Sequence, residues 1–411
     1  MKKLLVILLV ILALFAGFTA WNTKNTPAAD PGQGPVIEDD HAPDSLPVEE
    51  GVDAAAAPAE PVEIRHVDYD AIRALHPEDE TAIQMADESV TWGEFCGMLS
   101  ATGRDIESYF DQMATYYGVA ADWDGSIGDG SGQSYAQYAV SETREYLESL
   151  LAIRGYAGEQ GVALDEEQVK SLEPEELARL VLGEDASVGE FYAALDEEAH
   201  MSFETYRAMR EANLLYTKLI DTLYGPAGEK VSEEDAVAWL EEQDYLAAGH
   251  ILLMTIDPNT GDALDEAVVR AKRERAGEIA AELQAIEDQE ALLKRFMELK
   301  EAECEDTGKT VYPEGYTFQP GTMVQEFEAA VRALGEYKVS DPVETAYGYH
   351  VIMRLPLKGD ASLMTLSGST TTARQELAVS GITADLDAFQ EAHPAEYIEG
   401  LEDFELAPYI H

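Results

Sequence analysis

The sequence is poor in basic residues and in cysteine. Its 411 residues include two cysteines, and 27 Lys plus Arg stand against 81 Asp plus Glu, which gives a formal net charge of -54 at pH 7. So few basic residues argue against nucleic acid as a partner, because binding to the phosphate backbone requires cationic side chains. They also argue against adhesion to an anionic membrane surface through a basic face. The hydrophobic fraction of 46% is nevertheless that of a globular chain.

Patterns that would indicate metal or nucleophilic chemistry are missing. The sequence has no HExxH or CxxC pattern, and no Ser or Cys nucleophile has a base at motif spacing. Hydrolase and metalloenzyme functions are therefore poor candidates, and no cofactor or metal is expected. Cys96 and Cys304 are too sparse for a disulfide framework, so they are either two separate buried thiols or one bridge.

Uncharged hydrophobic runs are also scarce, with one exception at the N-terminus. The chain starts with Met-Lys-Lys, and an apolar stretch follows from Leu4 to Phe18. A short positive segment before such a stretch is typical of an export signal. Residues 1–21 are expected to be either an uncleaved single-pass membrane anchor, with the lysines inside, or a cleaved signal peptide. In both cases the rest of the chain is extracytoplasmic.

Composition and periodicity divide the remaining chain into four segments. Residues 22–79 are rich in Pro, Ala and acidic residues, which predicts a disordered acidic tether. Residues 80–246 show recurrent helical periodicity and predict a mostly helical domain. Residues 247–358 begin with an apolar strand-like run, continue with helices and end in a strand pair, which predicts a compact α+β unit. Residues 359–411 form a C-terminal segment with one helix.

Two helix boundaries can be predicted from local signals. A helix is expected to start near Thr91, because Glu94 follows three residues later and completes a capping box. A long charged helix from about Asp265 to Glu303 is expected to break near Asp288.

Three polar residues of the α+β unit are candidates for chemistry. His250 opens an apolar strand, His350 lies within another, and Asp306 lies in a polar loop. A histidine in an apolar strand is more often structural than catalytic, so residue types alone leave both interpretations open.

Longer motifs in the same unit resemble a known family. GHILL at 249–253 is similar to the opening strand of a parvulin-type peptidyl-prolyl cis-trans isomerase, and the run from Phe318 to Leu355 is similar to that family's second half. There the family has an aromatic, then G-x-M-v-x-x-F-E, G-x-v-S-x-P-V and T-x-x-G-y-H-i-I. The resemblance implies a β-α-α-β-α-β-β unit and isomerase, or rotamase, activity without a cofactor.

The whole chain resembles the PrsA/SurA-like extracytoplasmic foldases. An export segment, a helical domain that opens with VTWGEF, and one parvulin unit follow each other in that order. The resemblance implies that residues 80–246 are a SurA-N-like chaperone domain and that residues 359–411 pack back on it. The implied partners are unfolded or partly folded exported polypeptides with X-Pro bonds.

The resemblance also assigns roles to individual residues. It implies three catalytic residues, namely His250, Asp306 and His350. It implies a substrate-binding set formed by Phe318, Met323, Phe327 and Thr345. One segment departs from the family, because Val311–Phe318 reads VYPEGYTF and Gly315 stands where a pocket leucine is expected. Two functions therefore remain: an active isomerase and chaperone, or a non-catalytic holdase chaperone with a vestigial parvulin domain.

Overall fold

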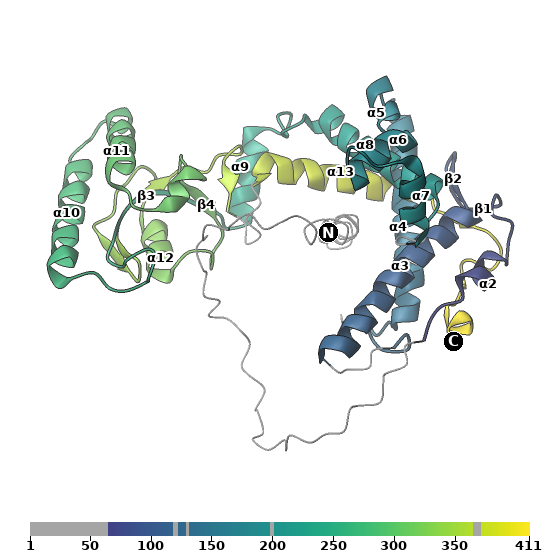
Figure 1. Cartoon of the computed structure of the whole chain (residues 1–411). Coiled ribbons are helices and arrows are strands. Elements are labelled where there is room, and N and C mark those ends of the chain that lie inside the picture. The colour runs from purple at the N-terminus through teal and green to yellow at the C-terminus, as the bar shows by residue number, and fades with distance from the viewer. Residues whose placement is uncertain (1–64, 118–121, 129–130, 198–200, 365–370) are drawn as a thin grey trace, which may run out of the picture. The chain divides into compact units, whose positions relative to one another are not determined.

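The computed structural model describes residues 65–117, 122–128, 131–197, 201–364 and 371–411 (Figure 1). The expected export segment, 1–21, lies outside the described residues, and so does most of the expected tether. A helix with the length and apolar character of a membrane span is not found in the described part of the chain. The chain divides into two compact units, one formed by the described residues up to Leu215 with Leu386–His411, the other by Tyr216–Asp385. The domain limits drawn from the sequence stay predictions.

The first unit combines a small antiparallel sheet with helices. Its strand order is β2-β1-β9, with β1 at Thr81–Met85, β2 at Glu88–Thr91 and β9 at Glu396–Tyr397. The helices and helical turns that lie wholly in this unit are α2 Tyr69–Arg73, α3 Trp92–Gln112, η1 Met113–Tyr117, α4 Tyr135–Glu159, α5 Glu166–Lys170, α6 Pro174–Leu182, α7 Val188–Glu197 and η3 Ala407–Tyr409. Helices α8, Phe203–Tyr224, and α13, Ala373–Ala392, each pass from one unit into the other along the chain.

The start of α3 confirms the predicted capping box. The hydroxyl of Thr91 accepts the Glu94 backbone N–H, and the Glu94 carboxylate accepts the Thr91 backbone N–H at 2.7 Å. These two bonds satisfy donors that the first helical turn leaves without intrahelical partners.

Residues 65–79 are folded, which differs from the tether expected over 22–79. Helix α2 lies in this stretch with Ile72 fully buried, and Val67 forms a β-bridge with Ile410. The backbone N–H of His66 donates to the carbonyl of His411 at 2.9 Å. The end of the acidic segment therefore pairs with the C-terminus, a long-range contact that an average composition over 58 positions does not reveal.

The second unit contains the predicted β-α-α-β-α-β-β order. From β3 to β6 its elements are β3 Leu246–Met254, α10 Glu266–Gln284, α11 Gln289–Glu303, the 3₁₀ turn η2 Thr307–Thr310, β4 Tyr316–Phe318, α12 Gln325–Ala333, β5 Val343–Thr345 and β6 Gly348–Leu355. Helix α9, Glu233–Glu242, precedes them, and β7 Ser362–Leu363 and β8 Thr371–Thr372 follow. The predicted break near Asp288 is confirmed, because Asp288 is the N-cap of α11.

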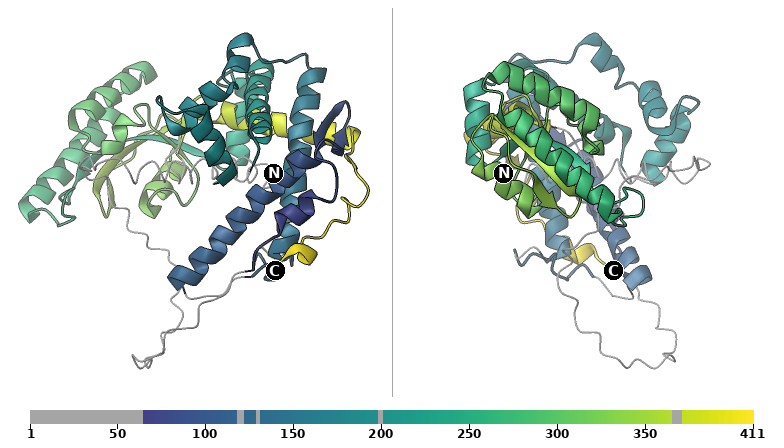
Figure 2. Two further views of the ribbon diagram at one scale, coloured as in Figure 1. Left: turned by 45° about the vertical axis from the view of Figure 1, so that its right-hand side comes forward. Right: turned by 90° about the vertical axis from the view of Figure 1, so that its left-hand side faces the viewer.

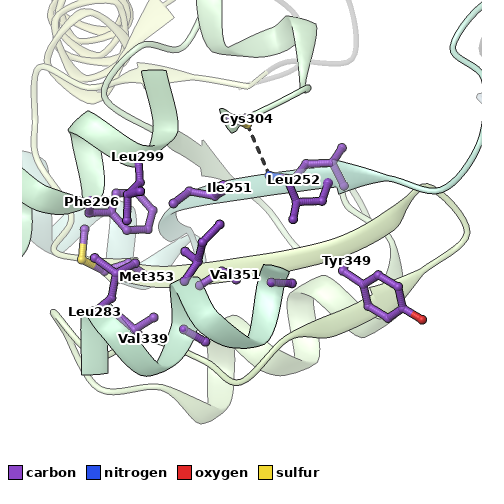
Figure 3. Close-up of a cluster of buried hydrophobic side chains, with 14 of the residues drawn as sticks. Ile251, Leu252, Leu283, Phe296, Leu299, Cys304, Val339, Tyr349, Val351 and Met353 are labelled. Atoms are coloured by element: carbon purple, nitrogen blue, oxygen red, sulfur yellow. Dashed lines mark hydrogen bonds between the residues drawn. The ribbon is translucent and has the colours of Figure 1, made fainter. Parts of the chain in front are cut away.

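The sheet of this unit has helices on both faces. Its strand order is β5-β6-β3-β4-β7-β8, and α10 and α11 lie side by side over one face (Figures 1 and 2). On that face Ile251, Val351 and Met353 pack with Phe296 and Leu299 of α11 (Figure 3). Helix α12 covers the other face through two buried residues, Phe327 and Val331. Strands β3 and β6 are buried on both faces, which explains their nearly continuous apolar sequences.

Candidate active site

The register of the central strands brings the two candidate histidines together. Strand β3 pairs antiparallel with β6, so that His250 lies opposite Ile352 and His350 lies opposite Leu252. Two residues in such a diagonal position on neighbouring strands project from the same face of the sheet. The Nδ1 atoms of His250 and His350 are 3.3 Å apart, and the two residues are 6% and 4% exposed.

Asp306 joins this pair from the loop after α11. It is the N-cap of η2, where its Oδ1 accepts the Gly308 backbone N–H at 3.0 Å. Its Oδ2 lies 2.9 Å from Nε2 of His250. Burial alone would raise the pKa of this carboxyl, but the hydrogen bonds from His250 and Tyr316 hold it well below its usual range. Asp306 is therefore an ionised carboxylate.

Thr345 lies on the far side of the pair. Its Oγ1 is 2.9 Å from Nε2 of His350 and accepts the Tyr347 backbone N–H at 3.1 Å. The structure thus brings this expected substrate-binding residue into the same hydrogen-bond chain as the two histidines.

The carboxylate dictates one arrangement of protons along this chain. Asp306 can only accept, so Nε2 of a neutral His250 carries the proton and its Nδ1 accepts from Nδ1–H of His350. Nε2 of His350 then accepts the hydroxyl proton of Thr345. Each ring nitrogen is therefore either a hydrogen-bond donor or an acceptor, because the group to which it bonds is fixed as the opposite.

The two histidines differ in their affinity for a further proton. Burial lowers the pKa of His250, but the neighbouring Asp306 and, after it, Cys304 outweigh this effect and raise it above 6.5. Burial and the nearby His250 lower the pKa of His350 to about 3. The pair therefore takes up its first proton on His250 and resists a second, as expected for two coupled groups.

The apolar candidates lie on the same face as the histidines. The Phe327 ring stands nearly perpendicular to His250, with ring centroids 5.4 Å apart, and it contacts His350 and Phe318 as well. Phe318 is fully buried, whereas Met323 is half-buried at the edge of the cluster. Met364, which the sequence analysis did not single out, packs against this cluster, and its N–H donates to Thr317 O at 2.8 Å.

Gly315, in the segment that departs from the family pattern, lies against Ala248 and Leu355. A Cβ at Gly315 would lie 2.8 Å from both the Ala248 carbonyl oxygen and Cδ1 of Leu355, and the glycine has a φ of 133°. Position 315 therefore admits only glycine and faces Leu355 rather than the histidines.

Tyr316 is the residue of this segment that reaches the site, and sequence reasoning missed it. Its hydroxyl donates to Oδ2 of Asp306 at 2.5 Å, and its ring lies 5.5 Å from that of His250. A signal was present, because Tyr316 is two positions before Phe318 and so projects from the same face of a strand.

Both cysteines are buried free thiols. The Cys304 sulfur accepts the Leu252 backbone N–H at 3.4 Å (Figure 3). Over the described ranges, His, Cys, Asp and Glu side chains form no cluster suited to a metal ion.

This site lies in a stretch that matches a family. Residues 250–355 match the family model of the PPIC-type PPIASE domain, Rotamase, so the chain carries a parvulin-type peptidyl-prolyl isomerase domain within an α+β fold.

Curated relatives extend the likeness to particular proteins, the PrsA foldases. The chain is 48% identical over 58 residues to foldase protein PrsA 3 of Bacillus cereus, which is 14% of this chain and 20% of that protein. It is 60% identical over 35 residues to foldase protein PrsA of Geobacillus kaustophilus, which is 8% of this chain and 12% of that protein. The matches thus span a fifth or less of the length of these two relatives.

Solved structures similar to the chain carry related names. PrsA from Bacillus subtilis is 17% identical with a TM-score of 0.23, over 77% of this chain and 91% of that chain. A structure described as one of two SurA-like chaperones of Campylobacter jejuni is 20% identical with a TM-score of 0.22, over 67% of this chain and 100% of that chain.

Proposed function

We propose that the protein is a peptidyl-prolyl cis-trans isomerase and chaperone that assists the folding of exported proteins at the outer face of the cytoplasmic membrane. The observation that carries this proposal is the hydrogen-bonded pair of His250 and His350, joined to Asp306, inside a PPIC-type domain. The pair lies against Phe327, so polar and apolar groups converge on one face of the sheet.

The chemistry requires a shaped site and no cofactor. Rotation about an X-Pro bond faces a barrier of roughly 20 kcal/mol, because the planar amide loses its resonance when it twists. The reaction makes and breaks no covalent bond. Catalysis requires only that the site binds the twisted amide more tightly than either planar form.

The proposed roles follow from the position of each residue. Met323, half-buried beside Phe327, contacts the proline ring. The fully buried Phe318 packs against the Phe327 ring and holds it in place. His250 and His350 present an ordered polar surface to the turning amide, Thr345 fixes the tautomer of His350, and Asp306 supplies the charge that orders the pair. Each preference of about 1.4 kcal/mol for the twisted amide accelerates the reaction about tenfold.

The cellular role rests on the sequence and the relatives. The positive start and apolar run from Leu4 to Phe18 support export, and the similar proteins are named foldases and SurA-like chaperones. We propose that residues 80–246 bind unfolded polypeptides and that residues 359–411 complete this domain. Pairing of Ile83 in β1 with Tyr397 in β9 supports the second point.

The expected activity can be measured on an unphosphorylated X-Pro peptide by NMR exchange spectroscopy. Catalytic amounts of the full chain should raise the cis-trans exchange rate above the uncatalysed rate. Without a catalyst, one isomerisation takes on the order of tens to hundreds of seconds. An exchange rate that stays at the uncatalysed value would contradict the isomerase proposal. If the chain then still suppresses aggregation of an unfolded client, it is a non-catalytic holdase.

A further inference from the structure

We propose that Tyr316 is a positioning residue of this site, whose hydroxyl holds the Asp306 carboxylate in the orientation that fixes the proton arrangement of the two histidines. The catalytic consequence rests on the proposed isomerase function. The structural consequence, a fixed tautomer at each histidine, can be measured without it.

The Asp306 carboxylate receives three hydrogen bonds. Oδ1 accepts the Gly308 backbone N–H at 3.0 Å, and Oδ2 accepts both the Tyr316 hydroxyl at 2.5 Å and Nε2–H of His250 at 2.9 Å. Asp306 lies in a loop and its side chain is 20% exposed. A partly exposed loop carboxylate can turn toward water, so the donors around it determine where it points.

Tyr316 is the rigid partner in this contact. Its backbone lies in β4 and pairs with Ala248 of β3. Its ring packs between Tyr312, at a centroid distance of 5.0 Å, and His250, at 5.5 Å, and the residue is buried. A phenol with two torsions, both restrained by packing, presents its hydroxyl at a fixed point.

The space around the hydroxyl also depends on Gly308. A Cβ at that position would lie 2.1 Å from the Tyr316 hydroxyl oxygen and 3.3 Å from Oδ1 of Asp306. The absence of a side chain at Gly308 therefore leaves room for the Tyr316 hydroxyl to reach the Asp306 carboxylate beside the turn.

Loss of the hydroxyl should act on the histidines through Asp306. Without this donor the carboxylate can turn away from Nε2 of His250, and neither tautomer of His250 is then enforced. Since His350 takes its tautomer from His250, both rings become mixtures. Turnover should fall because only a fraction of the molecules then present the donors and acceptors of the two histidines in the arrangement that faces the amide. The apolar contacts of Met323 and Phe327 remain.

The test is Tyr316→Phe in the full chain, read by long-range ¹H–¹⁵N NMR of the imidazole nitrogens about two pH units above the ordinary histidine pKa. The wild type should show one tautomer at His250, protonated on Nε2, and one at His350, protonated on Nδ1. The variant should show averaged nitrogen shifts, a kcat lowered about tenfold and an unchanged KM. Gly308→Ala, whose Cβ would lie 2.1 Å from the same hydroxyl oxygen and so displace it, should reproduce this result even if Tyr316→Phe folds poorly.

Tyr312→Phe is the matched control, because it removes a neighbouring phenol hydroxyl that makes no bond to Asp306 among the described contacts. Combining Tyr316→Phe with Asp306→Asn should lower kcat no further than Asp306→Asn alone, since both changes act through one group. Single, unchanged tautomers in folded Tyr316→Phe and Gly308→Ala would overturn the inference, as would additive losses in the double variant. A wild type without isomerase activity would refute the proposed function, and the tautomers would still decide this inference.

Discussion

Phe327→Ala should destabilise the sheet of the second unit by about 3–5 kcal/mol, the usual cost of removing a buried phenylalanine ring. The residue is 2% exposed and its ring contacts both histidines and Phe318, so its loss leaves a cavity between α12 and the sheet. Hydrogen exchange of the β3 and β6 amides reports this unit without assuming that the whole chain unfolds in one step. Their protection should fall at least about a hundredfold, since about 1.4 kcal/mol corresponds to tenfold.

The matched control is Met297→Ala on α11 of the same unit. Met297 is 41% exposed, so its truncation should change the free energy of unfolding by less than about 0.5 kcal/mol. Equal protection of β3 and β6 in the Phe327 and Met297 variants would show that Phe327 is not part of the core beneath the site.

The free energy of unfolding of the wild type should fall as the pH is lowered from about 6.5 to about 3, and His350 should cause part of this loss. In the unfolded chain this histidine takes up a proton near pH 6.5, but in the folded chain its pKa is lowered to about 3. The unfolded state therefore binds more protons in this window, so stability falls as the pH falls, with a slope approaching about 1.4 kcal/mol per pH unit. His250 acts in the opposite direction, because its pKa is raised and its contribution is lost as the pH rises.

His350→Gln isolates this effect. Calorimetric unfolding of wild type and variant, compared at pH values of about 6.5 and about 4.5, should show the wild type losing about 2 kcal/mol more than the variant. His393→Gln, which replaces a histidine that is 36% exposed in the first unit, is the control. A difference between wild type and His350→Gln that is the same at both pH values would mean that His350 does not remain neutral in the folded protein.

The sequence predicted those parts of the fold that depend on neighbours in the chain or on long periodic runs. The capping box of Thr91 and Glu94 and the break at Asp288 are local, and both are confirmed. The strands that carry His250 and His350 are eight or nine residues long and flanked by distinctive motifs, so they could be found as well.

The features that the sequence did not reveal depend on tertiary contacts. Strands β7, β8 and β9 have two residues each, too few to show an alternating pattern. Helix α2 has five residues, and its segment is held by pairing with the C-terminus. The hydrogen bond from Tyr316 to Asp306 joins a strand to a loop, and only the geometry of β4 against η2 brings the two groups within 2.5 Å.

We propose above all that an ionised Asp306 orders the histidine pair for X-Pro isomerisation. The most direct test compares the wild type with Asp306→Asn, which keeps the shape of the side chain and removes its charge, by exchange spectroscopy on one unphosphorylated X-Pro peptide. The wild type should accelerate exchange, and the variant should lose about tenfold to a hundredfold of that acceleration while its β3 and β6 amides stay protected, since a hydrogen bond to a charged group contributes about 1.5–3 kcal/mol. Equal acceleration by a folded Asp306→Asn variant, or no acceleration by the wild type, would contradict the claim.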